Sequence, residues 1–508
     1  MIEYLPNWEI GGYFTLHFVF LFYSSYRVFT YGKLIHEESS HFGFSDGWKI
    51  IGRPKDDIDH EWYSFKNFVT EQALFFIIHM IMSQVMRMLK PKSVSYCYAT
   101  ISFLFLLQRY GAFVTIAFSL STLLMYFVSK KTSKAILWTL GFIYLIILNI
   151  LKTNSVYDYI IMTTHLDDQR SYEVLVIFAW ILLKCISYGI ESIESRQGLM
   201  EEEQDMDDFS LQAFLGYVFY FPTMYFGPIM IYSRFRKTLN ETSNPLTTGK
   251  ILKFLFEIIM AMLWTTFLEC ALHFFYIHNL QDNYEIVTQL DSWALYGLGY
   301  LLGQFFHIKY VICYGIGIAF ARLDGIDPPK KPKCITRIHL YSDMWKHFDH
   351  GLYEFLFKYI YSALCLKTSS IQRKFIASFI TFLFIYIWHG FYFYIFIWSF
   401  LNYLCVTIES FSREMSRTSQ YRNLIEKYFS KNWEYRWNGA MGTLLLIPAI
   451  ISNFFFFTNY DVGLVFMQRT FFDGFLHYMC VFSYVICTFF TSEFIKRREQ
   501  YVLKQHHN

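Results

Sequence analysis

Long apolar stretches with almost no charged residue recur along the chain. Each is about 20 residues long, enough to cross the roughly 30 Å hydrocarbon core of a bilayer as a helix. Apolar residues follow one another in them instead of alternating at every second position, which favours helices over a transmembrane β-barrel. The clearest windows are residues 11–30, 135–151, 174–190, 375–398 and 474–490. The pattern predicts an all-α integral membrane protein, a polytopic bundle of about ten to twelve spanning and re-entrant helices.

The composition agrees with a membrane protein. Of 508 residues, 54% are hydrophobic and 17% are charged, whereas soluble domains carry about 25% charged residues. The longest polar stretches run to about 25 residues, too short to fold alone. We therefore predict a single multi-pass membrane domain over residues 1–508, a monomer surrounded by lipids, with a short cytosolic tail from about residue 496. We expect no nucleic-acid partner.

Charged clusters between the apolar runs predict the orientation. Lysines and arginines gather at residues 130–134, 330–333 and 496–498, so we expect these loops in the cytosol. The acid-rich loop at residues 56–61 is assigned to the lumen. The nine cysteines are scattered, with no spacing typical of a disulfide framework or a zinc site. The first apolar run lacks the features of a cleaved signal peptide, so we expect it to be retained as a span.

Two ionisable residues lie in apolar surroundings. Residues 345–362 have apolar side chains at helical spacing, which predicts an amphipathic helix at the interface or half-embedded in the membrane, and Asp349 lies in it. His389 lies deep in the sequence IYIWHGFYFYIF. Ionisable groups at membrane depth generally face a cavity or a partner, and Gly390 beside the histidine would let a ligand approach. His389 is a candidate general base; a core histidine bonded to a backbone carbonyl is the alternative.

The segments around these residues resemble a known family. They read RIHLYSDMWKHFDHGLYEFLFKYIY, IYIWHG followed by LNYLCVTIE, and LGYVFYFPTMYFGPIMIYSRF. They are similar to the membrane-bound O-acyltransferases, whose mark is a histidine in an apolar helix and an upstream Asn or Asp, and in particular to the hedgehog acyltransferase branch and its insect counterpart. The resemblance runs from about residue 62 to about residue 472, and the two marked positions are His389 and Asp349.

The resemblance implies an enzyme of the endoplasmic reticulum or Golgi membrane. Such an enzyme transfers palmitate from palmitoyl-CoA to the α-amine of an N-terminal cysteine on a secreted signalling protein, such as a hedgehog protein or an EGF-like ligand. Because the donor arrives from the cytosol and the acceptor from the lumen, the implied bundle surrounds a central reaction chamber. Two other interpretations stay open: a relative that acylates a serine hydroxyl or a lipid alcohol, and a proton-coupled transporter that uses Asp349 and His389.

The resemblance also suggests roles for the two marked residues. His389 would accept a proton from the attacking amine or position that amine. Asp349 would either support the imidazolium, as a buried acid does in a hydrolase triad, or hold the donor thioester and assist the departure of CoA. Because the family places the pair on opposite sides of the chamber, we favour the second role.

Further residues are candidates for binding. Lys346 and Lys358, on the amphipathic helix, would attract the phosphates of CoA, although positive loops also arise from orientation alone. Trp345 would line the chamber or simply pack. The resemblance implies that Asn453 donates to the thioester oxygen, with helix–helix hydrogen bonding as the alternative. It also implies that Cys334 ligates the iron of haem b, with a free or S-palmitoylated cysteine as the alternative.

Overall fold

Helices make up almost all the regular structure of the computed structural model, which describes residues 5–38, 43–153, 157–158, 161, 165–199, 206–240, 246–335, 339–365 and 370–507. The long helices are α1 (Asn7–Glu38), α4 (Val94–Lys131), α5 (Lys134–Leu151), α7 (Asp168–Arg196), α10 (Thr248–Ala271), α13 (Ser292–Leu323), α17 (Ile371–His389), α18 (Phe393–Ser416), α20 (Lys431–Phe457) and α22 (Phe475–His507). The shorter ones are α2 (His60–Glu71), α3 (Ala73–Leu89), α8 (Leu211–Val218), α9 (Tyr232–Asn240), α11 (Ile277–Asp282), α12 (Tyr284–Gln289), α14 (Tyr341–His347), α15 (His350–Leu356), α16 (Ser362–Leu364), α19 (Ser419–Tyr428) and α21 (Tyr460–Phe471). Single turns are η1 (Pro91–Ser93), η2 (Met206–Phe209), η3 (Phe221–Thr223) and the π-helical η5 (Phe357–Tyr361), and β1 (Phe44–Ser45) pairs antiparallel with β2 (Lys55–Asp56).

The helices confirm the predicted membrane fold. Within the described residues, nine helices are long and apolar enough to cross a membrane: α4, α5, α7, α10, α13, α17, α18, α20 and α22. α2 and α3 pass the same test together and are bent by 57° between them, so they add a tenth span if the bent pair is one. α1 covers the first predicted window but is not among the nine. The protein is a polytopic all-α membrane protein.

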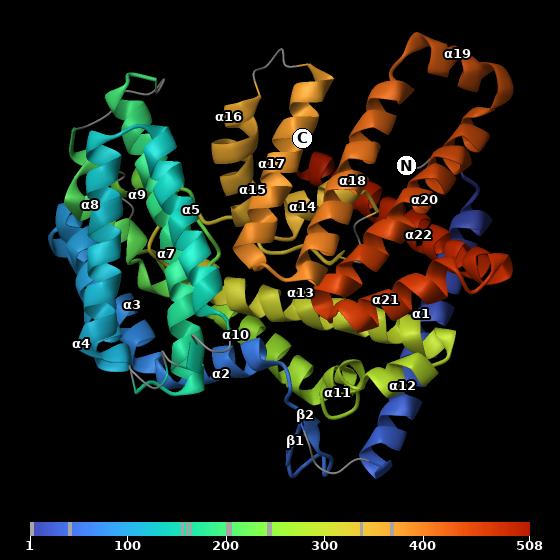
Figure 1. The fold of residues 1–508 in the computed structure, drawn as a ribbon, viewed down its shortest axis with the longest axis horizontal. Coiled ribbons are helices and arrows are strands. Elements are labelled where there is room, and N and C mark those ends of the chain that lie inside the picture. The colour runs from blue at the N-terminus through green and yellow to red at the C-terminus, as the bar shows by residue number, and fades with distance from the viewer. Residues whose placement is uncertain are drawn as a thin grey trace.

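The predicted continuous span over residues 375–398 is wrong, because the chain turns sharply at Gly390. α17 ends at His389 and α18 begins at Phe393, and the two helices lie side by side (Figure 1). Gly390 has a φ of 136°, a conformation that residues with a side chain rarely adopt. Glycine therefore permits the turn, and two helices replace one.

The predicted single helix over residues 345–362 is also interrupted. α14 ends at His347, and α15 starts at His350 with Asp349 as its N-cap residue. Beyond α15 the helix widens into the π turn η5 before α16. Asp349 thus lies at a break between two helices instead of in the middle of one.

A buried segment without regular helix, residues 224–231, passes against α13 and α15. A Cβ atom on Gly317 would lie 2.8 Å from the carbonyl oxygen of Gly227, and one on Gly351 would clash with the carbonyl oxygen of Ile229. Only glycine allows such close passage of one backbone against another. Lys184 of α7 is buried, and its ammonium donates to the carbonyl of Val218 and to the hydroxyl of Thr223, shortly before this segment. Irregular backbone at membrane depth is tolerated where protein surrounds it, as here.

α13 lies in the middle of the bundle. It packs against α1, α10 and α20, and in Figure 1 it crosses between a lower part with α11, α12 and the two strands and an upper part with α14 to α20. Lys309 of α13 forms ion pairs with Asp59 at 3.0 Å and with Glu61 at 2.7 Å. These pairs attach the acid-rich loop to the central helix.

Candidate active site

His389 is the last residue of α17, directly before the turn at Gly390. In Figure 1 the junction of α17 and α18 lies at the level of α13. The imidazole meets Trp398 and Phe456 edge to face, with ring centroids 5.2 and 5.1 Å away. Among the described residues neither ring nitrogen has a hydrogen-bond partner, and the side chain is half-buried. The carbonyl bond expected of a core histidine is therefore not present in this part of the chain.

Asn149 of α5 holds the turn around His389 from the neighbouring helix. Its amide nitrogen donates to the carbonyl of Ile387 at 2.9 Å, and its amide oxygen accepts from the backbone N–H of Phe391 at 3.2 Å. The carbonyl of Leu145 takes the second amide hydrogen at 2.8 Å. One side chain thus binds the backbone both before and after the histidine. It supplies partners that the end of α17 and the start of α18 would otherwise lack.

Both carboxylate oxygens of Asp349 accept hydrogen bonds. Oδ1 accepts from the backbone N–H of Leu352 at 2.9 Å, which caps α15, and Oδ2 accepts from the hydroxyl of Tyr314 on α13 at 2.7 Å. The Tyr314 ring contacts Tyr310, whose hydroxyl donates to Glu61 at 2.9 Å. The carboxylate is therefore held in one orientation by α13 and by its own helix.

An aromatic cluster lies between Asp349 and His389. Phe348, next to Asp349, stacks on Phe306 with centroids 5.1 Å apart, and Phe306 meets Phe456 at 5.6 Å. Phe456 in turn contacts the His389 ring. No hydrogen bond joins Asp349 to His389 in the described residues. The structure brings the two residues into one aromatic environment without the direct carboxylate–imidazole bond of a hydrolase triad.

Trp345 and Asn453 belong to a hydrogen-bonded cluster that joins α14, α18 and α20. The indole N–H of Trp345 donates to Asn402 at 3.1 Å. The side-chain oxygen of Asn453 accepts from the indole of Trp398 at 3.2 Å and from the hydroxyl of Tyr341 at 3.4 Å, and its nitrogen donates within α20. Helix–helix hydrogen bonding, the alternative for Asn453, is thus what this arrangement contains.

The two lysines differ in their surroundings. Lys358 lies in the π turn and donates to the carboxylate of Glu191 at 2.6 Å and to Ser233 at 3.0 Å. Glu191 of α7 is fully buried, so this ion pair fixes the π turn to α7. Lys346 is exposed in the last turn of α14. Contact with CoA phosphates stays a prediction for both residues.

Cys334 lies half-buried in the linker between α13 and α14. Its sulfur is 3.9 Å from both side-chain polar atoms of Gln304 on α13, and the next residue, Ile335, packs at Gly303. The thiol is therefore held against α13. In the described ranges no group of three or more His, Cys, Asp or Glu residues could hold a metal ion, but a single axial thiolate would not need such a group.

Sequence reasoning missed Asn149, Asn402 and Tyr314. The two asparagines stand in apolar helical sequence, and a polar residue at membrane depth generally marks a hydrogen bond between helices or a site. That signal was sufficient to nominate both asparagines. Tyr314 carried no signal of its own, because tyrosine is frequent throughout this sequence, with 40 copies.

Comparison with known proteins gives full-length similarities. The model of the membrane-bound O-acyltransferase family, MBOAT, matches residues 122–452. The protein-cysteine N-palmitoyltransferase Rasp of Drosophila melanogaster is 33% identical over 504 residues, 97% of this chain and 96% of the relative. The protein-cysteine N-palmitoyltransferase HHAT of Mus musculus is 25% identical over 476 residues, 92% of this chain and 94% of the relative. The region matched by the family model contains both helix interruptions, with Asp349 and His389.

The hydrogen bonds of Asn149 give a first testable prediction. Asn149→Leu removes both bonds to the turn, and at about 1 kcal/mol each their loss should let the backbone around Phe391 open more readily. We expect faster hydrogen–deuterium exchange in peptides covering residues 387–392 and a lower thermal midpoint. Thr139→Val on the same helix is the control, because its exposed hydroxyl bonds only within α5. Equal exchange in the two variants would contradict the role of Asn149.

Proposed function

Because the chain belongs to the membrane-bound O-acyltransferase family, we propose that it is a protein-cysteine N-palmitoyltransferase. It moves palmitate from palmitoyl-CoA to the amine of an N-terminal cysteine on a secreted signalling protein. The relatives Rasp and HHAT, named for this activity, support the proposal over nearly the full chain. The observation that carries it is the imidazole of His389, half-buried among aromatic rings with no hydrogen-bond partner in the described residues.

In the reaction the amine nitrogen attacks the carbonyl carbon of the thioester. A C–N bond forms, the C–S bond breaks, and the proton lost by the amine passes to His389 and then to the departing CoA sulfur. An imidazole that has no hydrogen-bond partner among the described residues keeps a nitrogen available for this proton. The carbonyl end of α17 favours a positive charge on its last residue, so the helix end stabilises the transient imidazolium. Alignment of amine and thioester within about 3 Å would supply much of the acceleration.

Asp349 acts on the donor side. Its oxygens accept from Leu352 and Tyr314, and the aromatic cluster separates it from His389, which supports a role apart from the base. A carboxylate held in this way can fix the geometry of the break between α14 and α15, where the thioester would lie. It can also influence the departure of CoA. Trp345 and Asn453 would then line the chamber through the cluster that joins α14, α18 and α20.

The enzyme would work in the membrane of the endoplasmic reticulum or the Golgi. Palmitoyl-CoA would enter from the cytosolic side and the acceptor from the lumen, so that the two meet at the interrupted helices. The lower part of the bundle in Figure 1, with β1 and β2, carries the acid-rich loop that the charge pattern assigns to the lumen. Lys346, exposed at the end of α14, is the lysine best placed to meet CoA phosphates.

Cys334 would provide the axial thiolate of a haem b group. The half-buried thiol, set against α13 beside Gln304, fits a single sulfur ligand. Haem held there would have a structural or redox function apart from acyl transfer. We predict a Soret band in the purified protein that disappears in Cys334→Ser and persists in Cys480→Ser, whose thiol is exposed. A band that survives in both variants, or is absent from the parent protein, would refute haem ligation by Cys334.

The acceptor is tested with synthetic peptides and an alkyne analogue of palmitoyl-CoA. A peptide with a free N-terminal cysteine should be labelled through a bond that resists neutral hydroxylamine, as an amide does, whereas the N-acetylated peptide should not be labelled. A peptide with an internal serine and a blocked N-terminus is the control for hydroxyl acylation. Equal labelling of the free and acetylated peptides would exclude the amine acceptor, and labelling of the serine peptide alone would favour the hydroxyl-acylating alternative.

The roles of His389 and Asp349 can be separated by substitution. His389→Ala should lower kcat by about 10²- to 10⁴-fold, while His17→Ala, which removes a buried histidine bonded to Thr488, should keep the activity. Asp349→Asn keeps a good N-cap side chain but loses the charge, so we expect normal folding with greatly reduced turnover. Full activity in Asp349→Asn would exclude a need for the negative charge at this position, and full activity in His389→Ala would exclude the base.

A further inference from the structure

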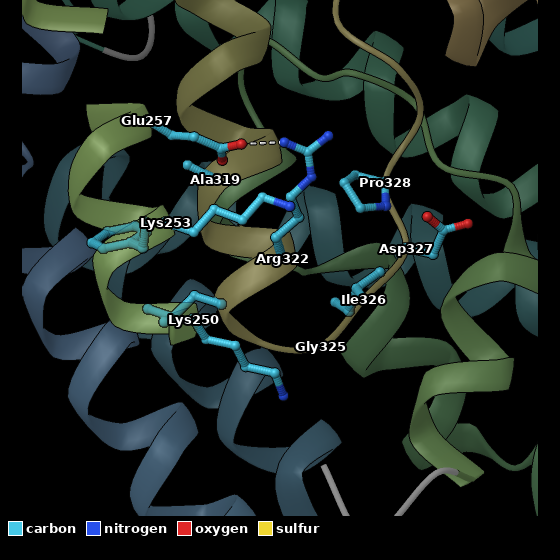
Figure 2. Close-up of a pocket in the computed structure, with 11 residues that line it drawn as sticks. Lys250, Lys253, Glu257, Ala319, Arg322, Gly325, Ile326, Asp327 and Pro328 are labelled. Atoms are coloured by element: carbon cyan, nitrogen blue, oxygen red, sulfur yellow. Dashed lines mark hydrogen bonds and ion pairs between the residues drawn. The ribbon is translucent and has the colours of Figure 1, made fainter. Parts of the chain in front are cut away.

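A cavity of about 350 Å³ opens between α10 and α13 (Figure 2). Its walls come from the first turns of α10, the last turns of α13 and residues 325–328 of the linker. Figure 2 shows Lys250 and Lys253 on one side and Arg322 on the other, with Glu257 facing Arg322. Every lining residue lies on these three elements, so the cavity is separate from the interrupted helices that carry Asp349 and His389.

Cations exceed acids around this cavity. Both acids in its wall are engaged, Glu257 with Arg322 and Asp327 with Arg234 of α9. Lys331 of the linker reaches α13, since its ammonium would lie 3.9 Å from a Cβ atom on Gly315. Burial holds the pKa of Lys331 below its ordinary value, with Arg322 and Lys253 adding repulsion against the attraction of Glu257. Such an accumulation of positive charge is suited to an anion that brings several acceptor oxygens.

The position of the cavity in the helices indicates the depth of the ligand. Lys250 lies in the first turn of α10 and Arg322 in the last turn of α13, and both helices are candidate membrane spans. The ends of spanning helices lie at the level of the lipid headgroups. An anion bound here is therefore held where phospholipid phosphates are found.

The surface next to the cavity is apolar and open. α10 is covered by protein over little of its length, and Leu255, Phe256 and Ile259 are 48%, 63% and 53% exposed. These side chains face the surrounding lipid, so a ligand with its phosphate in the cavity can lay its acyl chains along α10. Palmitoyl-CoA bound in this way would keep its thioester on the outside of α13, away from His389. The geometry therefore favours a lipid over the acyl donor.

We propose that this cavity binds the phosphorylated headgroup of an anionic phospholipid. Lys253, Arg322 and Lys331 contact the phosphate oxygens, and the lipid chains cover the outer face of α10. The bound lipid offsets the positive charge between α10 and α13 and thereby stabilises the packing of the two helices. This site goes beyond acyl transfer and does not depend on the proposed enzymatic activity.

The test uses the purified full-length protein, with phosphatidylinositol 4-phosphate as the probe and phosphatidylcholine as the neutral comparison. Native mass spectrometry counts the bound lipids during a titration. The pocket variant combines Lys253→Gln with Lys331→Gln, and the control combines Lys330→Gln with Lys333→Gln, two exposed lysines of the same linker. A loss of about fivefold per lysine predicts affinity about 25-fold lower in the pocket variant, with the control and the neutral lipid unchanged.

Each other result overturns the proposal. Equal weakening in both variants would mean diffuse surface charge instead of a site, and equal binding of both lipids would mean no headgroup recognition. Displacement of the lipid by adenosine 3′,5′-diphosphate, together with a raised KM for palmitoyl-CoA in the pocket variant, would assign the cavity to the acyl donor. Because lipid binding is measured without acyl transfer, its outcome is independent of the catalytic assignment.

Discussion

The structure depends on the hydrogen bonding of backbone groups where two helices are interrupted. A helix end leaves carbonyl and N–H groups without partners, and each such group at membrane depth costs several kcal/mol unless it is bonded. At the end of α17 the side chain of Asn149 bonds the backbone on both sides of the turn. At the start of α15 the carboxylate of Asp349 takes the N–H of Leu352. The interruptions persist because each one is capped by a side chain.

These caps also prepare the interior for chemistry. If the helix continued past His389, its next turn would fill the space beside the imidazole. The turn at Gly390 instead leaves His389 at a helix end among aromatic rings. The ring has edge-to-face contacts with Trp398 and Phe456, and in the part of the chain that the structure describes no hydrogen bond occupies its nitrogens. At the other break both carboxylate oxygens of Asp349 are bonded. The same physical requirement thus places an imidazole among aromatic rings at one break and a carboxylate with both oxygens bonded at the other.

The sequence predicts the helical membrane fold and both ionisable residues, because these depend on local composition. It does not predict the two interruptions, since residues 375–398 carry no Asp, Glu, Lys or Arg and the turn depends on the non-helical backbone of Gly390 and Tyr392. The partners are also distant: Asn149 is 238 and 242 residues from the groups that it bonds. For Lys358 the sequence suggests a phosphate contact, but its ammonium forms an ion pair with the buried carboxylate of Glu191, 167 residues away. Such pairings follow from the packing of helices, which hydrophobic periodicity does not encode.

α13 determines how the polar sites relate to one another. Lys309, Tyr314 and Arg322 follow one another at intervals of five and eight residues, which corresponds to about 7.5 and 12 Å along the helix axis and to turns of about 140° and 80° around it. The three side chains therefore face different neighbours: the acid-rich loop, Asp349 and the cavity beside α10. Because they share one helix but no direct contact, a change at one of them can reach the others only through a shift or tilt of α13. The glycines that let the buried segment pass close to α13 oppose such a shift, since the backbones already lie at contact distance. The close packing of α13 thus opposes coupling between the surroundings of Asp349 and the cavity at the end of the helix.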